Sequence, residues 1–135
     1  MNSREGGCLC GHIRYRVSGN IIDSGYCHCR ICQRSAGAPV LAWFTVETRQ
    51  FHYSNGKPTS YTSSLKAVRE FCRECGTQLV YRASTGDKVD ITTASLDAPD
   101  GVEPQYHIWR SSRIAWFETK DALPRHNDSG PDWVP

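Results

Sequence analysis

The sequence predicts an all-β domain, and three observations support this fold class. Apolar and polar residues alternate in several short runs, which is the period of a strand with one buried face. Turn-forming stretches separate several of these runs, and no long window keeps its apolar residues at the 3.6-residue period of a helix. At 135 residues the chain has the length of a single domain. We therefore expect one β domain over residues 1–123.

The first predicted strand is HIRYRVSG, residues 12–19, in which Ile13, Tyr15 and Val17 alternate with polar residues. Six further β-rich runs follow: VLAWFTV (40–46), FHYS (51–54), YTSS (61–64), AVREFC (67–72), TQLVYR (77–82) and VDITTA (89–94). The stretches SNGKP (54–58), CRECG (72–76) and STGDK (84–88) are typical of turns. Helix is expected only for a turn or two near residues 29–36 and again near 120–123. The proline-rich end, residues 124–135, is expected to be a loosely ordered tail.

The charge and hydropathy of the chain argue against several classes of partner. Lys and Arg number 16 against 14 Asp and Glu, which leaves a formal charge of +2, and no run of like charges occurs. Binding to nucleic acid or to an anionic membrane surface therefore has little support. No stretch approaches the roughly 18 consecutive apolar residues of a membrane span, and the start MNSREGG lacks the apolar core of a signal peptide. We expect a soluble cytoplasmic protein, whose oligomeric state the sequence leaves open.

Cysteine is the residue type that points to a function. Seven cysteines are many for this length, and their odd number would leave one thiol over in a complete set of disulfides. In a reducing cytosol, clustered cysteines are more often metal ligands than disulfide partners. They fall into three short clusters: CLC (Cys8, Cys10), CHCRIC (Cys27, Cys29, Cys32) and CREC (Cys72, Cys75).

One closed zinc site is predicted from the first and last clusters, with the ligands Cys8, Cys10, Cys72 and Cys75. Residues two apart in an extended chain point to the same side, with Cα atoms about 6.6 Å apart, so Cys-x-Cys can supply two ligands. Cys-x-x-Cys followed by glycine, here Gly76, is the tight-turn ligand pair of zinc ribbons. A structural zinc normally has four protein ligands, and the two pairs together supply that number.

The middle cluster, Cys27, Cys29 and Cys32, supplies three ligands and leaves one coordination position open, as in catalytic zinc sites. His28 is a candidate for the fourth ligand, although an extended chain would point it away from its two neighbours. Two alternatives stay open: a closed site completed by a distant histidine such as His107, or a pair of ligands with a spare buried thiol. An open site that is rich in thiolates can lose its metal or oxidise, so this zinc is expected to be labile.

An open zinc with three thiolate ligands suits a thiol substrate better than it suits hydrolysis. Its net charge is near −1, so the ion polarises a bound water less than a site with three histidines does. A fourth thiolate would be deprotonated by the metal and would stay nucleophilic. Arg30 and Arg34 flank the cluster and could hold the carboxylates of an anionic thiol, for which glutathione is the obvious cytosolic candidate.

With these residues in view, the chain closely resembles the family of glutathione-dependent formaldehyde-activating enzymes and centromere protein V, and it looks like the short members of that family. The matching elements run in family order across residues 6–117. They are GGCLCGHIRY (6–15), CHCRICQRSAG (27–37), YTSS (61–64), REFCRECGTQLVYR (69–82), SLDAP (95–99) and HIWRSSRIAW (107–116).

The resemblance implies a β-tent fold of coiled antiparallel sheets with two zinc sites. A structural zinc would lie at Cys8, Cys10, Cys72 and Cys75, and a catalytic zinc at Cys27, Cys29 and Cys32, in agreement with the spacing. The implied activity is that of a carbon–sulfur lyase, which in reverse adds the thiol of glutathione to formaldehyde. The physiological thiol and aldehyde, and the direction of the reaction, are not given by the resemblance.

For other residues in the matching segments, the sequence gives less indication of whether they contact a ligand. Trp109 and Trp116 are expected to be core or interface aromatics rather than contacts of a ligand. Tyr61, Ser63 and Ser64 could line a pocket or could simply pair across the sheet.

Two other functions compete with the enzyme. A non-catalytic binding module stabilised by zinc would be expected to carry a basic or low-complexity extension, which this sequence lacks. A thiol redox enzyme could use Cys29 and Cys32 as a Cys-x-x-Cys pair, but Cys27 and the missing βαβ context are then unexplained.

Overall fold

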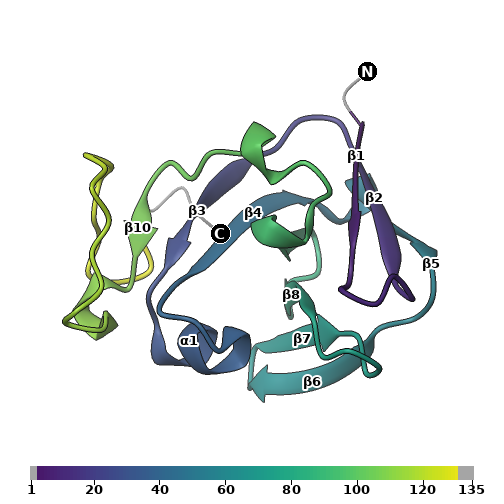
Figure 1. Ribbon diagram of the computed structural model, residues 1–135, viewed down its shortest axis with the longest axis horizontal. Coiled ribbons are helices and arrows are strands. Elements are labelled where there is room, and N and C mark those ends of the chain that lie inside the picture. The colour runs from purple at the N-terminus through teal and green to yellow at the C-terminus, as the bar shows by residue number, and fades with distance from the viewer. Residues whose placement is uncertain (1–2, 131–135) are drawn as a thin grey trace.

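Residues 3–130, which the computed structural model describes, form two β-sheets that lean against each other (Figure 1). One sheet has three strands in the order β1-β2-β5, and the other has seven in the order β10-β3-β4-β9-β8-β7-β6. All paired strands are antiparallel except β10 and β3. The strands are β1 (Ser3–Gly7), β2 (Arg14–Ser18), β3 (Asp23–Cys27), β4 (Leu41–Glu47), β5 (Phe51–Asn55), β6 (Thr59–Ser64), β7 (Ala67–Phe71), β8 (Gln78–Ala83), β9 (Lys88–Thr92) and β10 (His107–Ile108). The expected all-β class and β-tent fold are confirmed.

The runs that were predicted as strands correspond to β2 and to β4 through β9. Three strands were not predicted, namely β1, β3 and β10. The helix expected near residues 29–36 is present as α1 (Arg30–Ala36), whereas the one expected near residues 120–123 is wrong, because that segment is irregular. The other helical pieces within residues 3–130 are single 3₁₀ turns at Thr48–Gln50, Thr93–Ser95, Pro99–Gly101 and Arg110–Ser112.

The short helix α1 begins and ends at residues suited to those positions. The Cys29 sulfur caps its N-terminus by accepting a hydrogen bond from the backbone N–H of Cys32, and Gly37 ends it with a left-handed φ of 63°. α1 spans only 7 residues. None of the helices in the described part of the chain has the length and apolar character needed to span a membrane.

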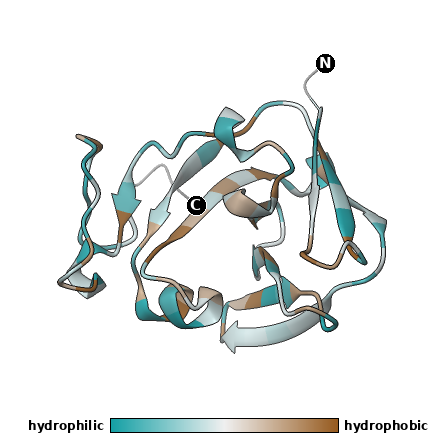
Figure 2. Cartoon of the chain, viewed as in Figure 1, coloured by the Kyte–Doolittle hydropathy of each residue, from teal (hydrophilic) through white to brown (hydrophobic). Residues whose placement is uncertain are grey.

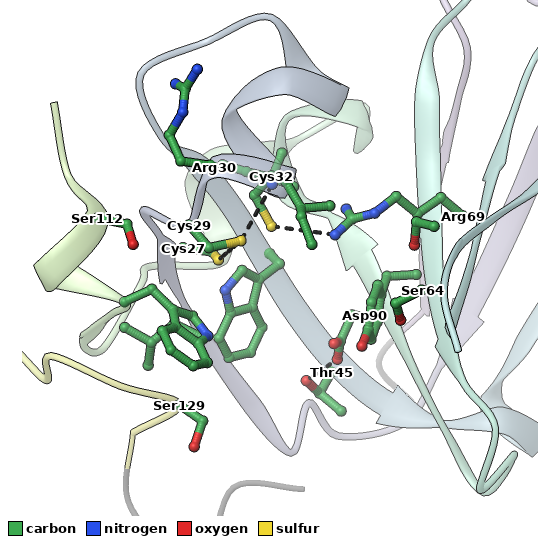
Figure 3. Close-up of a pocket in the computed structure, with 17 residues that line it drawn as sticks. Cys27, Cys29, Arg30, Cys32, Thr45, Ser64, Arg69, Asp90, Ser112 and Ser129 are labelled. Carbon is green, nitrogen blue, oxygen red and sulfur yellow. Dashed lines mark hydrogen bonds between the residues drawn. The ribbon is translucent and has the colours of Figure 1, made fainter. Parts of the chain in front are cut away.

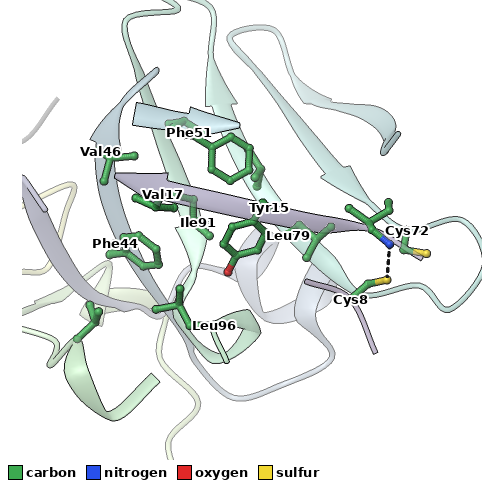
Figure 4. Packing of buried hydrophobic residues seen from close by; sticks show 14 residues of the cluster. Cys8, Tyr15, Val17, Phe44, Val46, Phe51, Cys72, Leu79, Ile91 and Leu96 are labelled. Atoms are coloured by element: carbon green, nitrogen blue, oxygen red, sulfur yellow. Dashed lines mark hydrogen bonds between the residues drawn. The ribbon is translucent and has the colours of Figure 1, made fainter. Parts of the chain in front are cut away.

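The main core fills the space between the two sheets (Figure 4). Tyr15 and Val17 of β2 point into it from the small sheet, and Phe44 and Ile91 point into it from the large sheet. Each of these four side chains is fully buried, as alternation along the strands predicts. Cys8 and Cys72 lie at one end of this same core.

Polar strand β6 forms one edge of the large sheet. Figure 2 shows it without the brown bands that mark apolar residues on β4. An edge strand made of hydroxyl-bearing residues is a poor template for pairing with another apolar strand. The hydroxyls of Ser63 and Ser64, at its end, lie instead beside the pocket described below.

The segment after Leu123 pairs with the chain around β10. His107 forms two backbone hydrogen bonds with this segment: its N–H donates to the carbonyl of Pro124, and its carbonyl accepts from the N–H of His126. The Trp109 N–H donates to the carbonyl of Asp128. Residues 124–128 are therefore held to the chain around β10 by backbone hydrogen bonds, while residues 131–135 lie outside the described residues. The domain boundary at residue 123 and the loosely ordered tail over residues 124–135 stay predictions.

Candidate metal centres and the pocket beside them

The four cysteines predicted to form a closed site lie together. Their sulfur atoms are all within 4.8 Å of one another, with Cys8 Sγ 3.6 Å from Cys10 Sγ and Cys10 Sγ 3.8 Å from Cys72 Sγ. Four sulfurs placed about 2.3 Å from a central zinc ion would be about 3.8 Å apart at the corners of a tetrahedron. The donor set and its spacing therefore fit a closed structural zinc site.

Local backbone geometry explains how this cluster forms. The Cys8 sulfur accepts a hydrogen bond from the backbone N–H of Ile13, which closes the turn between β1 and β2. Between β7 and β8, Gly76 has a φ of 82° and donates its backbone N–H to the carbonyl of Cys72. A residue with a side chain would be strained at this φ, so the glycine after the cysteine pair has a conformational role.

Hydrogen bonds from the side chain and backbone of Thr77 lower the pKa of Cys75 to about 5, which favours its thiolate.

The other three cysteines form a second cluster at the start of α1 (Figure 3). Cys27 ends β3, Cys29 caps the helix and Cys32 lies one turn further on. Cys27 Sγ and Cys29 Sγ are 3.4 Å apart, and all three sulfurs lie within 4.8 Å of one another. Hydrogen bonds from Cys27 and Cys32 lower the pKa of Cys29 to about 2. The cluster thus offers three sulfur donors, which suits a thiophilic metal ion.

The structure does not bring His28 or His107 to this cluster. His28 points away from its two cysteine neighbours and is fully buried, as is His107. Their rings are joined by a hydrogen bond of 2.8 Å between His28 Nε2 and His107 Nδ1, and His107 Nε2 lies 3.0 Å from a carboxylate oxygen of Asp121. The buried histidines therefore anchor the backbone between Cys27 and Cys29, and neither reaches the sulfur cluster in this geometry.

The three-cysteine cluster opens onto a pocket of about 540 Å³, and the four-cysteine cluster does not. This volume falls in the range of small-molecule sites, roughly 300–1,000 Å³. One face of the large sheet forms the floor, with Leu41 and Trp43 of β4 among its apolar residues. The cysteine loop and α1 form one wall, and residues from Ile108 to Ser112, together with Ser129, form another (Figure 3).

A row of polar residues crosses the floor of this pocket on neighbouring strands. The strand register places Arg69 beside Tyr81, Tyr81 beside Asp90, and Asp90 beside Thr45. The Arg69 guanidinium packs over the Tyr81 ring, 5.1 Å from its centre, and its Nη2 lies 3.6 Å from Cys32 Sγ. Thr45 donates its hydroxyl to Asp90 Oδ1 over 2.5 Å.

Arg69 provides a buried positive charge at the sulfur cluster. It is only 7% exposed, and within residues 3–130 it forms no ion pair with a carboxylate. A guanidinium next to sulfur favours the thiolate form, because opposite charges attract strongly away from water. Arg69 therefore donates to the sulfur cluster through Nη2 and to the Ser35 hydroxyl through Nη1.

Asp90 provides a negative charge further along the floor. It is half-buried, and desolvation raises its pKa to about 6, although the hydrogen bond from Thr45 acts in the opposite direction. Asp23, Tyr81, Tyr106, Arg69 and Lys88 are the charged or titratable groups near it. At neutral pH the carboxyl group is mainly ionised, since its pKa lies below 7.

Of the two arginines predicted to contact a ligand, only Arg30 lines the pocket. Arg34 lies on the exposed side of α1. Ser63 and Ser64 line the pocket, whereas Tyr61 is exposed outside it.

The two tryptophans predicted to be core or interface aromatics are not in the core. Trp109 lines the pocket with a left-handed φ of 57°, and Trp116 is 76% exposed.

Sequence reasoning missed Arg69, Asp90 and Thr45 as residues of the site. Asp90 and Thr45 lie between apolar neighbours on β9 and β4, and Arg69 is followed by a second charged residue on β7. Polar residues at such positions are usually interpreted as facing solvent. One feature of the sequence could have indicated them: Arg69 and Asp90 carry opposite charges within predicted strands, and the strand of Arg69 leads directly into the Cys72–Cys75 pair. Their proximity depends on strand register, which short motifs do not encode.

The fold and the two clusters define a class: a β protein with one closed set of four cysteines and one set of three cysteines that faces a pocket. The family model described as glutathione-dependent formaldehyde-activating enzyme matches residues 3–112. The chain belongs to this family.

Two proteins illustrate the similarity. An uncharacterized lyase of Schizosaccharomyces pombe is 31% identical over 86 residues, a match that covers 64% of this chain. The chain spans 62% of the length of that relative. A crystal structure of a Rhodobacter sphaeroides protein superposes with a TM-score of 0.59 at 25% identity, over 74% of this chain and 91% of that one.

Proposed function

We propose that this chain is a cytoplasmic, zinc-dependent enzyme of the carbon–sulfur lyase type, which adds a thiol to a small aldehyde or catalyses the reverse reaction. Glutathione is the proposed thiol and formaldehyde the proposed aldehyde. The observation that carries the proposal is the contrast between the two cysteine clusters. Cys27, Cys29 and Cys32 face a pocket of small-molecule size, while the closed cluster does not. Family membership and the lyase relative support the same class of reaction.

The donor set at the pocket fits zinc with one position free for an exogenous ligand. Three sulfurs lie within 4.8 Å of one another, and no described histidine or carboxylate joins them. Cys27, Cys29 and Cys32 would hold the ion, which when bound supplies a positive centre that stabilises a thiolate at neutral pH. We propose one structural zinc at the other cluster and one labile, catalytic zinc here.

Protein groups around the cluster support thiol chemistry. Arg69 donates to the Cys32 sulfur and balances the negative charge that thiolates accumulate. The apolar floor at Trp43 and Leu41 keeps water away from the sulfurs, which strengthens these charge interactions. Arg30, at the exposed N-terminus of α1, is available to bind a carboxylate of the incoming thiol.

The first test is the zinc content of protein purified without oxygen, measured for the wild type and for Cys32→Ser. The proposal predicts about two zinc ions per chain in the wild type and about one in a variant that remains folded. Exchange NMR of formaldehyde with glutathione should show catalysed adduct formation only in the wild type. One zinc in both proteins, or an unchanged rate in Cys32→Ser, would contradict the proposal.

The two helix arginines offer a matched pair of controls. Arg30→Ala should raise the KM for glutathione, because Arg30 lines the pocket, and Arg34→Ala should leave it unchanged. An equal effect of both changes would point to nonspecific charge rather than a pocket contact. The alternative, a non-catalytic binding module, predicts a gel shift with duplex DNA at moderate salt and no thiol-dependent activity in any variant.

A further inference from the structure

We propose that Asp90, held by the Thr45 hydroxyl, binds an ammonium group of the thiol substrate, so that the pocket selects thiols carrying an amine far from the sulfur. This inference rests on the proposed function, because it assigns the remote end of the same thiol. It concerns a residue that belongs to neither cysteine cluster.

The balance of charge in the pocket leads to this assignment. Three thiolates around a divalent ion carry a net charge near −1, and the single guanidinium beside them, that of Arg69, compensates it. The Asp90 carboxylate forms no contact ion pair with any residue between 3 and 130, and Thr45 is its one hydrogen-bond donor there. Arg69 and Lys88 attract it only from a longer distance.

An unpaired carboxylate is costly in this environment. Asp90 lies on the floor of a pocket whose neighbouring surfaces include Trp43 and Leu41, and it is half-buried. Burying a charge without a partner is unfavourable unless a ligand or a metal supplies one. Because Oδ2 accepts no hydrogen bond from the described residues and Asp90 lines the pocket, a ligand can reach it.

Position on the sheet fixes which part of a ligand would reach Asp90. Arg69, which contacts the sulfur cluster, and Asp90 lie on the same face with one strand between them. Two strand spacings place the backbones of these two residues about 9.5 Å apart. Asp90 is therefore assigned to a group of the ligand that is remote from the sulfur. The γ-glutamyl amine of glutathione, which is separated from the sulfur by about a dipeptide, is such a group.

The test compares glutathione with its deaminated analogue, glutaryl-cysteinyl-glycine, in the zinc-loaded full chain. Both affinities are measured by calorimetry for the wild type and for Asp90→Asn. The wild type should bind glutathione about tenfold or more tightly than the analogue, as expected for a charge-assisted hydrogen bond. Asp90→Asn should bind glutathione about tenfold more weakly and should bind the analogue with nearly unchanged affinity.

Asp87→Asn is the matched control, because Asp87 is an exposed aspartate in the turn before β9 and lies outside the pocket. It should keep the wild-type preference for glutathione. Equal affinity of the wild type for the two thiols, or equal weakening of both by Asp90→Asn, would overturn the inference while thiol–aldehyde activity persisted. If neither thiol binds and neither reacts, the proposed function fails together with it.

Discussion

Replacing the Asp90 carboxylate should make the protein more stable while it weakens thiol binding. The ordinary pKa of an aspartate is 3.8, and that of Asp90 is raised to about 6 by burial. Because the folded state then holds its proton more tightly than the unfolded state, the folded protein loses stability as pH rises through this range. A difference of about two pKa units corresponds to about 3 kcal/mol. Asp90→Asn should recover up to this amount at pH 8.

The dependence on pH makes this prediction specific to one carboxyl group. At pH 5 Asp90 is mostly protonated in the folded protein, so the advantage of the variant should fall to about half of its value at pH 8. Urea unfolding of the zinc-loaded proteins, followed by tryptophan fluorescence between pH 5 and 8, measures the difference. The variant preserves the acceptor for the Thr45 hydroxyl, since an amide oxygen replaces the carboxylate oxygen.

Asp87→Asn again serves as the control, because an exposed side chain should leave the free energy of unfolding within about 0.5 kcal/mol of the wild type. The reasoning would be refuted if Asp90→Asn were less stable than the wild type at pH 8. It would also be refuted if the difference in the free energy of unfolding between the variant and the wild type stayed constant from pH 5 to pH 8. A constant difference could not be caused by the ionisation of a buried carboxyl group.

Three further changes test other parts of the structure. Cys72→Ser removes a fully buried member of the four-cysteine cluster and should eliminate one zinc together with much of the β-structure, as metal analysis and circular dichroism would show. Full retention of both would contradict a structural site. His107→Phe should cost about 1–3 kcal/mol, because it leaves His28 Nε2 buried without its partner, and a chelator should then remove the second zinc faster. An unchanged rate of zinc loss would contradict the anchoring role. Gly25→Ala should cost about 1–3 kcal/mol in urea unfolding, since its Cβ would lie 2.9 Å from the carbonyl oxygen of Tyr106. A variant as stable as the wild type would contradict this expectation and would show that the backbone near Tyr106 moves to accommodate the added methyl group.

Alternation along the chain predicted most of the fold because most strands pack one face against the main core. β2 is the clearest case, with Tyr15 and Val17 buried between charged neighbours. β1 escaped prediction because its sequence, SREGG, has no alternating apolar residues. Its Gly6 is required by a close approach, since an added Cβ would lie 2.4 Å from the Tyr15 hydroxyl. Contacts of this kind depend on the partner strand and leave no local pattern.

The clustering of the cysteines was predictable for the opposite reason, because much of its geometry is local. Cys27 and Cys29 are two residues apart in an extended segment, so their sulfurs meet whatever the rest of the fold does. The polar half of the site is different, because Arg69 and Asp90 come together only when β7, β8 and β9 pair in one register. Their positions would be interpreted as the solvent-facing side of each strand, whereas α1 and the segment after β10 enclose that side as a pocket.

The two faces of the large sheet have different roles: one packs against the main core, and the other lines the pocket. Val89 and Ile91 of β9 point to the main core, which also contains Cys8 and Cys72, so a metal at that cluster would stabilise the fold directly. Asp90, between them in sequence, points to the pocket, where Cys27 and Cys32 belong to a smaller apolar cluster. A change at the three-cysteine site therefore disturbs few core contacts, and the pocket can hold a destabilising carboxylate at a cost that the main core offsets.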